Sequence, residues 1–301
     1  MSIPRLKGIL SPVLTPFNSG LAPDPARFLA HCRKLVNAGV GLAVFGTNSE
    51  GNSLAVEEKV YLLEYLLDNG IPAERMMPGT GCCAFTDSVA LTRAALSRGC
   101  GGVLVLPPFY YKDVSVDGLF KTFAEIIERV GDARLRLYVY HIPPVAVVPI
   151  NAELLERLLK VYPGTVAGIK DSSGDWNHTE MLLRNFQSDT FDVFCGSEVF
   201  LLQTMRGGGA GSITATANTN APAIMDLYTH WQSPEADAKQ AKVTATRKVF
   251  AKLPMIASMK AVIARELNDP AWATPRPPLM PCEPGKVDAI MAELKSMGYA
   301  Y

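Results

Sequence analysis

Short apolar runs alternate with longer amphipathic stretches along most of the chain. The first apolar run covers residues 8–15, and Phe28 and Cys32 then begin an apolar stripe at helical spacing. Asp24 directly before Pro25 marks the start of this helix, because an acidic N-cap and a proline in the first helical turn are both favoured. The pattern therefore predicts a strand followed by a helix, and it repeats.

The repetition predicts eight strand-and-helix pairs up to about residue 232. The predicted strands are residues 8–15, 41–45, 75–78, 102–106, 137–141, 166–170, 191–195 and 211–215. The helices predicted after the first one are residues 56–67, 87–98, 116–130, 152–161, 177–185, 199–205 and 223–231. Two α/β architectures hold so many parallel strands, an open doubly wound sheet and a closed barrel. Eight uninterrupted pairs favour the (β/α)8 TIM barrel.

Beyond residue 232 the pattern changes to helices without strands. The predicted helices are residues 236–252, 254–267 and 286–297, with a proline-containing loop over 270–281. We therefore predict a barrel domain over residues 1–232 and a C-terminal helical region over residues 233–301.

Composition narrows the possible partners. The 29 basic and 29 acidic side chains cancel, which argues against a nucleic-acid binder that depends on summed charge. Hydrophobic residues make up 48% and charged residues 19%, a balance that excludes intrinsic disorder. No apolar run reaches the roughly 18 residues that span a bilayer, and the first residues lack the apolar stretch of a secretory signal. We expect no membrane partner and a cytoplasmic location.

Metal and nucleotide sites find little support in the sequence. The six cysteines are scattered without Cys-x-x-Cys spacing, which indicates reduced thiols, and of the histidines only His141 ends a predicted strand. Residues 79–84 fit the pattern Gly-x-Gly-x-x-Ala, but no ribose-binding acid follows about 20 residues later. We expect neither a metal nor a dinucleotide.

Lys170 is the sharpest chemical signal. In parallel α/β proteins the functional groups lie at the carboxyl ends of strands, and Lys170 ends an entirely apolar one. Desolvation disfavours an ammonium ion, and a neutral amine can attack a ketone to form an imine. The alternative is a lysine neutralised by the adjacent Asp171.

Other strand ends supply hydroxyl groups and a tight turn. Tyr140 ends a neighbouring strand, so its phenol could move protons to and from Lys170, with Thr47 and Tyr111 or its neighbour extending the relay. Each is also an ordinary packing or hydrogen-bonding residue when taken singly. The turn over residues 46–51 offers backbone N–H groups that suit a carboxylate, although an ordinary βα turn looks the same.

These motifs resemble the dihydrodipicolinate synthase and N-acetylneuraminate lyase family of pyruvate-dependent class I aldolases, over essentially the whole chain. The motifs are Gly46-Thr47-Asn48-Ser49-Glu50, Tyr140-His141-Ile142-Pro143, Gly168-Ile169-Lys170-Asp171-Ser172-Ser173-Gly174, Gly196-Ser197-Glu198 and Arg276-Pro277-Pro278-Leu279. The resemblance implies a TIM barrel with a C-terminal helical extension, a homotetramer, and a mechanism that needs no metal or organic cofactor.

The resemblance also implies roles for individual residues. Lys170 would be the Schiff-base lysine and Tyr140 the proton-transfer phenol, with Thr47 and Tyr111 as relay partners. The turn at Thr47 and Asn48 would hold the carboxylate of pyruvate. Other substrate-binding residues follow from the same motifs: Gly196 and Ile213 would line the pocket, and Ser197 and Glu198 would face the variable part of the substrate.

The chain departs from the family pattern where a second substrate would bind. Dihydrodipicolinate synthases typically carry an arginine after the tyrosine motif, whereas residues 143–148 contain no cation, and an apolar side chain does not replace a bidentate arginine. His141 and Asn48 also replace the common asparagine and threonine. We expect a Schiff-base lyase or aldolase acting on pyruvate or a related 2-oxo acid, with an unidentified aldehyde or sugar-acid partner. The alternatives are 4-hydroxy-tetrahydrodipicolinate synthase, a 2-keto-sugar-acid dehydratase and a non-catalytic 2-oxo-acid-binding protein.

Overall fold

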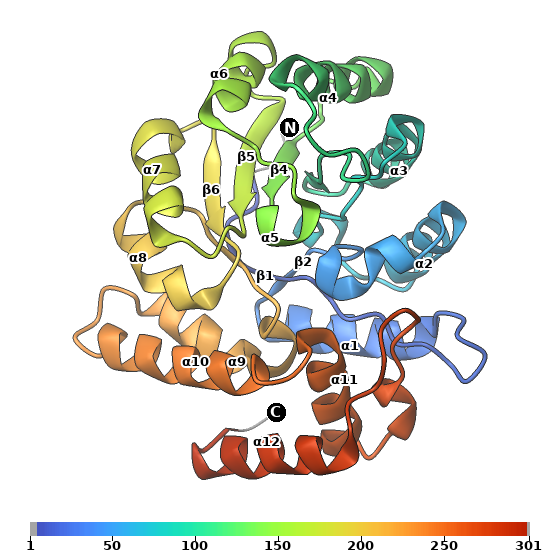
Figure 1. Cartoon of the computed structure of the whole chain (residues 1–301), viewed down its shortest axis with the longest axis vertical. Coiled ribbons are helices and arrows are strands. Elements are labelled where there is room, and N and C mark those ends of the chain that lie inside the picture. Colours follow the sequence, from blue (N-terminus) through green and yellow to red (C-terminus); the bar gives the residue numbers. More distant parts are fainter. Residues whose placement is uncertain (1–4, 300–301) are drawn as a thin grey trace. The chain divides into compact units, whose positions relative to one another are not determined.

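Strands and helices alternate along the chain in the computed structural model, which describes residues 5–299 (Figure 1). The strands are β1 (Gly8–Ser11), β2 (Gly41–Leu42), β3 (Val103–Val105), β4 (Leu137–His141), β5 (Val166–Asp171), β6 (Asp192–Cys195) and β7 (Gly211–Ile213). The α-helices are α1 (Pro25–Asn37), α2 (Val56–Asp68), α3 (Phe85–Ser97), α4 (Val116–Val130), α5 (Pro143–Ala146), α6 (Ala152–Val161), α7 (Trp176–Phe186), α8 (Leu201–Arg206), α9 (Ala217–Thr229), α10 (Ala236–Phe250), α11 (Met255–Glu266) and α12 (Pro284–Ser296). The predicted α/β class is confirmed.

The described residues form two compact units. The first unit contains residues 5–8 and 72–213, and the second contains residues 9–71 and 214–299. The second unit therefore joins a segment near the start of the chain to the whole C-terminal part. The division at residue 232, between a barrel and a helical region, stays a prediction.

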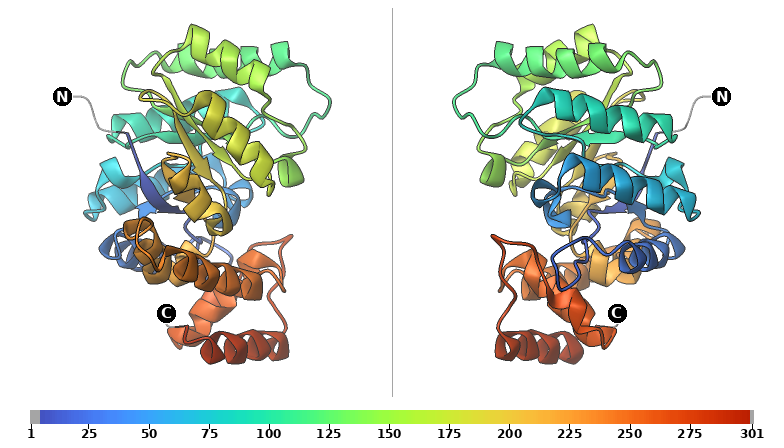
Figure 2. Two further views of the ribbon diagram at one scale, coloured as in Figure 1. Left: turned by 90° about the vertical axis from the view of Figure 1, so that its left-hand side faces the viewer. Right: turned by 90° about the vertical axis from the view of Figure 1, so that its right-hand side faces the viewer.

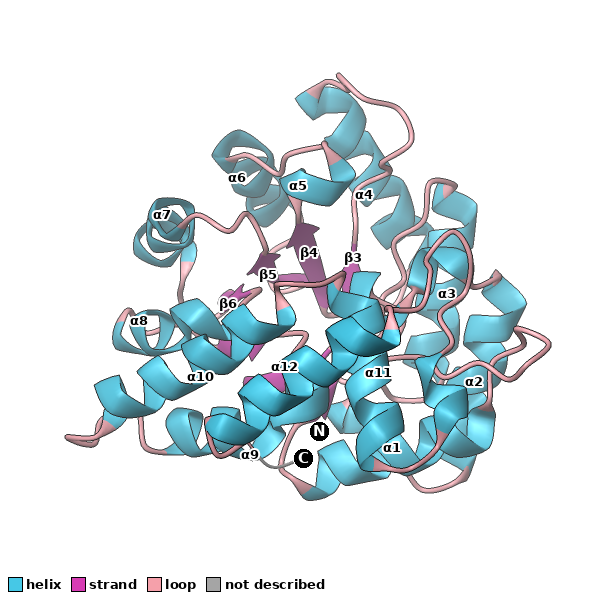
Figure 3. Cartoon of the chain, turned by 60° about the horizontal axis from the view of Figure 1, so that its bottom comes forward, coloured by secondary structure: helices cyan, strands magenta, loops and turns pink. Residues whose placement is uncertain are grey.

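The first unit is built on five parallel strands. Their order is β7-β6-β5-β4-β3, and all six residues of β5 are buried. Figure 3 shows β3 to β6 inside a ring of helices that includes α3, α4, α6, α7 and α8. Parallel strands covered by helices are buried on both faces, so their sequences are nearly continuous apolar runs. These runs are the pattern from which the strands were predicted. The register pairs Tyr140 with Lys170 and His141 with Asp171.

The strand predicted over residues 75–78 does not form, so this prediction is wrong. Only an isolated parallel bridge joins Gly79 to Leu104. The Leu104 N–H donates to the Pro78 carbonyl and the Thr80 N–H donates to the Leu104 carbonyl, each at 2.9 Å. Pro78 has no N–H to donate, so a regular ladder cannot continue through it. The segment runs beside β3 as expected but lacks strand geometry.

The second unit combines a short strand pair with helices from both parts of the chain. β1 pairs in parallel with β2, with Leu10 opposite Gly41. Helix α1 begins as predicted, because Asp24 Oδ1 accepts the Arg27 N–H at 3.0 Å. The last three helices enclose a common apolar core, and Figure 2 shows them in orange to red. This core includes Val249, Phe250, Met259, Val262, Ile290 and Leu294.

Two helices differ most from the sequence prediction, and both differ at prolines. Helix α9 starts at Ala217, whereas the predicted helix covers residues 223–231, and Pro222 therefore lies inside the helix, where proline is disfavoured. The structure accommodates Pro222 with a kink at Asn220, whose φ is −127°. The short helix α5 was not predicted, and it begins at Pro143, where a proline suits the first turn. Within residues 5–299, no helix is both long and apolar enough to cross a membrane.

Candidate active site

Lys170 and Tyr140 lie together at the ends of neighbouring strands in the first unit. Each is only 2% exposed. The Lys170 Nζ lies 4.1 Å from the centroid of the Tyr140 ring, a distance typical of a cation–π contact. The structure therefore brings these two predicted residues into contact where neither side chain has more than a small solvent-exposed surface.

Asp171 does not neutralise Lys170, in contrast to the alternative that the sequence left open. Successive side chains of a strand point to opposite faces, and the carboxylate points away from the amine. Asp171 Oδ2 accepts the Thr179 hydroxyl at 2.6 Å, and Oδ1 accepts the Ser173 N–H at 3.0 Å. Within the described part of the chain, Lys170 forms no ion pair.

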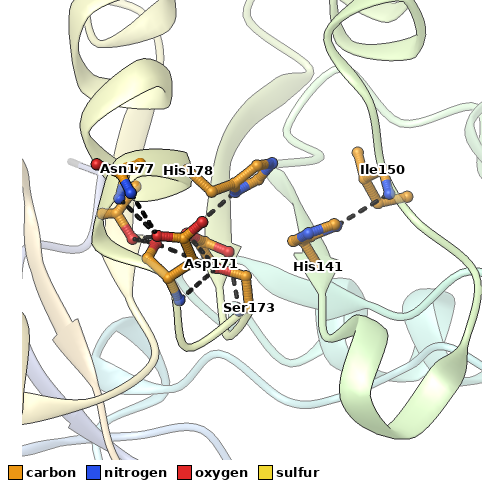
Figure 4. Close-up of polar contacts among 8 residues, drawn as sticks. His141, Ile150, Asp171, Ser173, Asn177 and His178 are labelled. Carbon is orange, nitrogen blue, oxygen red and sulfur yellow. Dashed lines mark hydrogen bonds and ion pairs between the residues drawn. The ribbon is translucent and has the colours of Figure 1, made fainter.

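Two stacked histidines complete the surroundings of Asp171 (Figure 4). His178 on α7 places its Nδ1 3.2 Å from Asp171 Oδ2, and its ring stacks on that of His141 with centroids 4.4 Å apart. Burial works to raise the pKa of Asp171, but the contact with His178 and the hydrogen bonds from Thr179 and Ser173 outweigh it and hold that pKa below its ordinary value. The Asp171 carboxylate in turn raises the pKa of His178. Sequence reasoning missed this cluster because His178 and Asp171 lie on different elements.

The cluster suits hydrogen bonding better than metal binding. His141, Asp171 and His178 each offer a ligand atom within 4.8 Å of the others. However, His141 Nδ1 already accepts the Ile150 N–H at 3.0 Å, which assigns the proton of a neutral imidazole to Nε2. Burial, and secondarily His178, lower the pKa of His141 to about 4. The two rings are nearly parallel, 18° apart, so their in-plane lone pairs do not converge on one ion.

Gly196 follows β6 and lies against the end of β5. Its N–H donates to the Asp171 carbonyl at 2.6 Å. A Cβ atom at this position would lie 2.8 Å from the Asp171 carbonyl oxygen, which is backbone and cannot easily move, so glycine favours this approach. The contact holds the backbone just after Lys170 in place.

The remaining predicted residues of the first unit lie at other strand ends. Ile213 ends β7 and is fully buried, and Glu198 is also buried. The Ser197 Oγ accepts the Val199 N–H at 3.4 Å and begins a short 3-10 helix. Tyr111, in contrast, is 73% exposed and packs edge-on against the Tyr110 ring. The structure thus places Tyr111 on the surface of this unit.

The turn that carries Thr47 and Asn48 belongs to the second unit. These residues open a 3-10 helix over Thr47–Ser49, and the Gly46 carbonyl accepts the Gly51 N–H at 3.0 Å. A Cβ atom at Gly51 would lie 2.0 Å from the Phe45 carbonyl oxygen, so the turn closes only with glycine there. Thr47 and Asn48 share this tight loop, while Lys170 and Tyr140 are residues of the first unit.

A buried ion pair adjoins this turn. Lys260 on α11 donates from Nζ to Glu50 Oε1, and neither side chain is exposed to solvent. The Arg276 N–H donates to Glu50 Oε2 at 2.7 Å, and Lys260 also donates to the Thr274 carbonyl at 2.9 Å. Burial lowers the pKa of Lys260 to about 8, with Glu50 opposing the shift.

Sequence reasoning missed Lys260, although a signal was present. Residues 256–263 are apolar apart from Ser258 and Lys260. A single cation inside an apolar helical stretch requires a buried partner. The partner could not be identified from the sequence, because Glu50 lies 210 positions away.

Arg276 extends the charged cluster towards α2. Its guanidinium donates to both carboxylate oxygens of Glu58, at 2.7 and 2.8 Å, and lies 4.7 Å from the Phe17 ring centroid. These hydrogen bonds lower the pKa of Glu58. The proline-rich segment that contains Arg276 is thereby tied to the helix that follows the turn.

Comparison with known proteins gives one consistent result. The model of the dihydrodipicolinate synthetase family matches residues 5–297. An uncharacterized DapA-like lyase from Chloroflexus aurantiacus is 35% identical over 298 residues, which cover 97% of this chain and 96% of the relative.

Solved structures agree with these sequence comparisons. The crystal structure of dihydrodipicolinate synthase from Agrobacterium tumefaciens matches with a TM-score of 0.89 and 28% identity, over 96% of this chain and 99% of the other. YagE from E. coli K12, a prophage protein of the dihydrodipicolinic acid synthase family in complex with pyruvate, matches with a TM-score of 0.89 and 23% identity. That match covers 98% of this chain and 99% of YagE, and at this identity it shows the fold alone.

Proposed function

The chain belongs to the dihydrodipicolinate synthetase family, and from this premise we propose that it forms a Schiff base between Lys170 and pyruvate or a related 2-oxo acid. The family places it among the lyases of class I aldolase type. The observation that carries the proposal is the buried contact between Lys170 and Tyr140, with no carboxylate paired to the amine in the described residues.

The proposed chemistry begins at the nitrogen of Lys170. Once it has given up a proton, the amine attacks the C2 carbonyl carbon, and the resulting carbinolamine loses water to give an imine. The protonated imine withdraws electrons, so C3 can lose a proton and become an enamine nucleophile. The enamine then adds to an aldehyde, or the reverse sequence cleaves a carbon–carbon bond, and water finally releases Lys170.

Each of these steps needs a proton carrier near the nitrogen. We assign this role to Tyr140, because Lys170 Nζ lies over its ring and both residues are buried. Thr47 and Tyr111 are the proposed relay partners. The exposure of Tyr111 supports a position at the entrance or at a second subunit, where the phenol can exchange protons with solvent.

The proposed grip on the substrate comes from small groups at strand ends. Thr47 and Asn48 hold the carboxylate through a turn that presents N–H groups. Gly196 and Ile213 line the pocket because one lacks a side chain and the other is buried and apolar. Ser197 and Glu198 meet the variable part of the substrate.

The second substrate is the least constrained part of the proposal. Residues 143–148 contain no cation, and Val145 and Val147 are each 59% exposed around α5. An apolar surface here favours an aldehyde or sugar acid with little charge at this end over the aldehyde substrate of 4-hydroxy-tetrahydrodipicolinate synthase. A 2-keto-sugar-acid dehydratase uses the same imine and is the second candidate.

The finer features of architecture belong to the same proposal. We propose that the strands close into a (β/α)8 barrel over residues 1–232, with residues 233–301 as a helical extension. We also propose that the protein is a homotetramer in the cytoplasm and that it acts without a metal or organic cofactor. The parallel strand order in the first unit and the family membership support this arrangement.

Borohydride trapping tests the proposal directly. The protein is incubated with pyruvate, reduced with borohydride and analysed by mass spectrometry before and after peptide mapping. We expect a mass increase equal to one pyruvic acid less one oxygen atom, located on Lys170. Lys170→Arg keeps the positive charge but forms no such adduct, because a guanidinium is not deprotonated in proteins.

The matched control is Lys160→Arg on α6, which changes a lysine of the same unit that lies outside the proposed site. This variant should trap pyruvate like the unchanged protein. An adduct that persists in Lys170→Arg, or an unchanged protein that gives none, would contradict the imine mechanism.

A further inference from the structure

We propose that Glu50 and Lys260 form a positioning pair that sets the shape of the turn carrying Thr47 and Asn48. The two residues act through the backbone of the turn and are not assigned any contact with the substrate. The inference rests on the proposed function of this turn, which is to hold the carboxylate of a 2-oxo acid. It assigns a role in substrate affinity to α11, a helix that contributes no proposed catalytic residue.

The backbone of the turn is held in an unfavourable conformation at Glu50. Its φ of 55° and ψ of 31° lie in the left-handed region, which costs free energy for a residue other than glycine. Such a conformation persists only where the surroundings impose it. The residue that bears the strain also has both oxygens of its carboxylate hydrogen-bonded.

The carboxylate of Glu50 is held at both oxygens. Lys260 Nζ donates to Oε1 and the Arg276 N–H donates to Oε2 at 2.7 Å. Both donors come from the C-terminal part of the chain, 210 and 226 positions away. The position of the Glu50 backbone is therefore determined by α11 and by the segment that follows it.

The rest of the turn transmits this position to the proposed carboxylate site. The Glu50 N–H donates to the Thr47 carbonyl at 3.2 Å, and the Thr15 hydroxyl donates to the Ser49 carbonyl at 2.7 Å. A shift of Glu50 must therefore move Thr47. Only Asn48 and Ser49 lie between Thr47 and the strained position, so the backbone has little freedom to absorb such a shift.

A role in stability alone does not account for the pair. The free energy needed to remove two charges from water is often larger than the free energy gained from their attraction. Well-packed apolar residues often stabilise a core at least as well as a buried ion pair. In some proteins, however, a buried polar or ionic group specifies one arrangement over others. We assign that role to Glu50 and Lys260.

The test compares pyruvate binding in three variants. Glu50→Gln and Lys260→Met each remove one charge, and the double variant removes both without leaving an unpaired buried charge. The pyruvate concentration for half-maximal borohydride trapping is measured together with the maximal trapping rate. We expect the half-maximal concentration to rise about tenfold or more in all three, while the maximal rate changes less than about threefold.

Two further variants separate positioning from general damage. Arg27→Met removes the ion pairs to Asp24 and Asp269 in the same unit and should leave the half-maximal concentration unchanged. Lys260→Arg keeps the charge and should restore most of the affinity for pyruvate. Far-UV circular dichroism establishes whether each variant is folded. If a single variant does not fold, the half-maximal concentration of the double variant tests the positioning role.

The outcomes distinguish this inference from the proposed function. If the unchanged protein traps no pyruvate, the proposed function fails first. If it traps pyruvate and the folded double variant has the same half-maximal concentration, the positioning role is overturned. A fall in the maximal rate with unchanged half-maximal concentration also overturns it.

Discussion

Two buried carboxylates lie beside the proposed reacting groups, and they are stabilised in different ways. Asp171 follows Lys170 in the first unit and is bound by a hydroxyl, a backbone N–H and a histidine. Glu50 follows the Thr47 turn in the second unit and is bound by a fully buried ammonium and a backbone N–H. Neutral hydrogen-bond donors are most of the partners of Asp171, whereas the main partner of Glu50 is the positively charged Lys260.

The difference predicts how each site responds to mutation. Neutral donors around Asp171 can turn to new partners or to water when the carboxylate changes. The ammonium of Lys260 has no exposed surface, so without Glu50 it must either remain buried with an unpaired charge or give up its proton. We therefore expect the surroundings of Asp171 to tolerate substitution of the carboxylate. In contrast, substitution of either Glu50 or Lys260 should destabilise the protein, because each requires the other as its partner.

The largest effect is expected for Lys260→Met. The variant leaves the charge of Glu50 buried without its partner, so the free energy of unfolding should fall by about 3–5 kcal/mol. The double variant with Glu50→Gln should recover most of this loss. Urea denaturation measures both values. A single variant as stable as the double variant would remove the contrast between the two carboxylates.

A smaller effect is expected for Asp171→Asn. The amide keeps one acceptor oxygen, so some hydrogen bonds to Ser173 and Thr179 survive, and the loss should be about 1–3 kcal/mol. The same denaturation experiment provides the measurement, and Ser197→Ala serves as a control at another strand end. A loss equal to that of Lys260→Met would show that neutral donors give no tolerance.

The smallest effect concerns pH and His178. Asp171 raises the pKa of His178 in the folded protein, so the stabilising charge is present below the ordinary histidine pKa of about 6.5 and is lost as pH rises through the raised value. His178→Gln should therefore cost up to about 1 kcal/mol near pH 5.5 and less near pH 9. Unfolding midpoints at the two pH values test this sign. An effect that grows with pH would contradict the assignment.

Much of the architecture could be predicted from local sequence, because each strand of the first unit is buried on both faces. Continuous apolar runs located β4 and β5, and Asp24 with Pro25 located the start of α1. The third predicted strand failed at Pro78, where the apolar pattern was right but a backbone donor was missing. Hydrophobic pattern reports burial, whereas a ladder also needs N–H groups.

Some residues of the candidate site could also be predicted from the sequence, and others could not. Lys170 and Tyr140 could be found because both lie at the carboxyl ends of predicted strands, and the register places them side by side. Lys260 could not be linked to Glu50, since a sequence shows that a buried cation needs a partner but not which carboxylate folds against it. His178 was missed for the same reason, as its contact with Asp171 depends on how α7 packs.

The long separation between Glu50 and Lys260 has a consequence for synthesis of the chain. A ribosome adding about 5–20 residues per second needs roughly 10–40 s to pass from one residue to the other. During that time residues 72–213 emerge as one continuous stretch that can begin to fold. Glu50 has already been synthesised, but Lys260, its ion-pair partner, has not. Under the positioning role proposed for Glu50 and Lys260, the turn of the carboxylate site reaches its final shape only after α11 has left the ribosome.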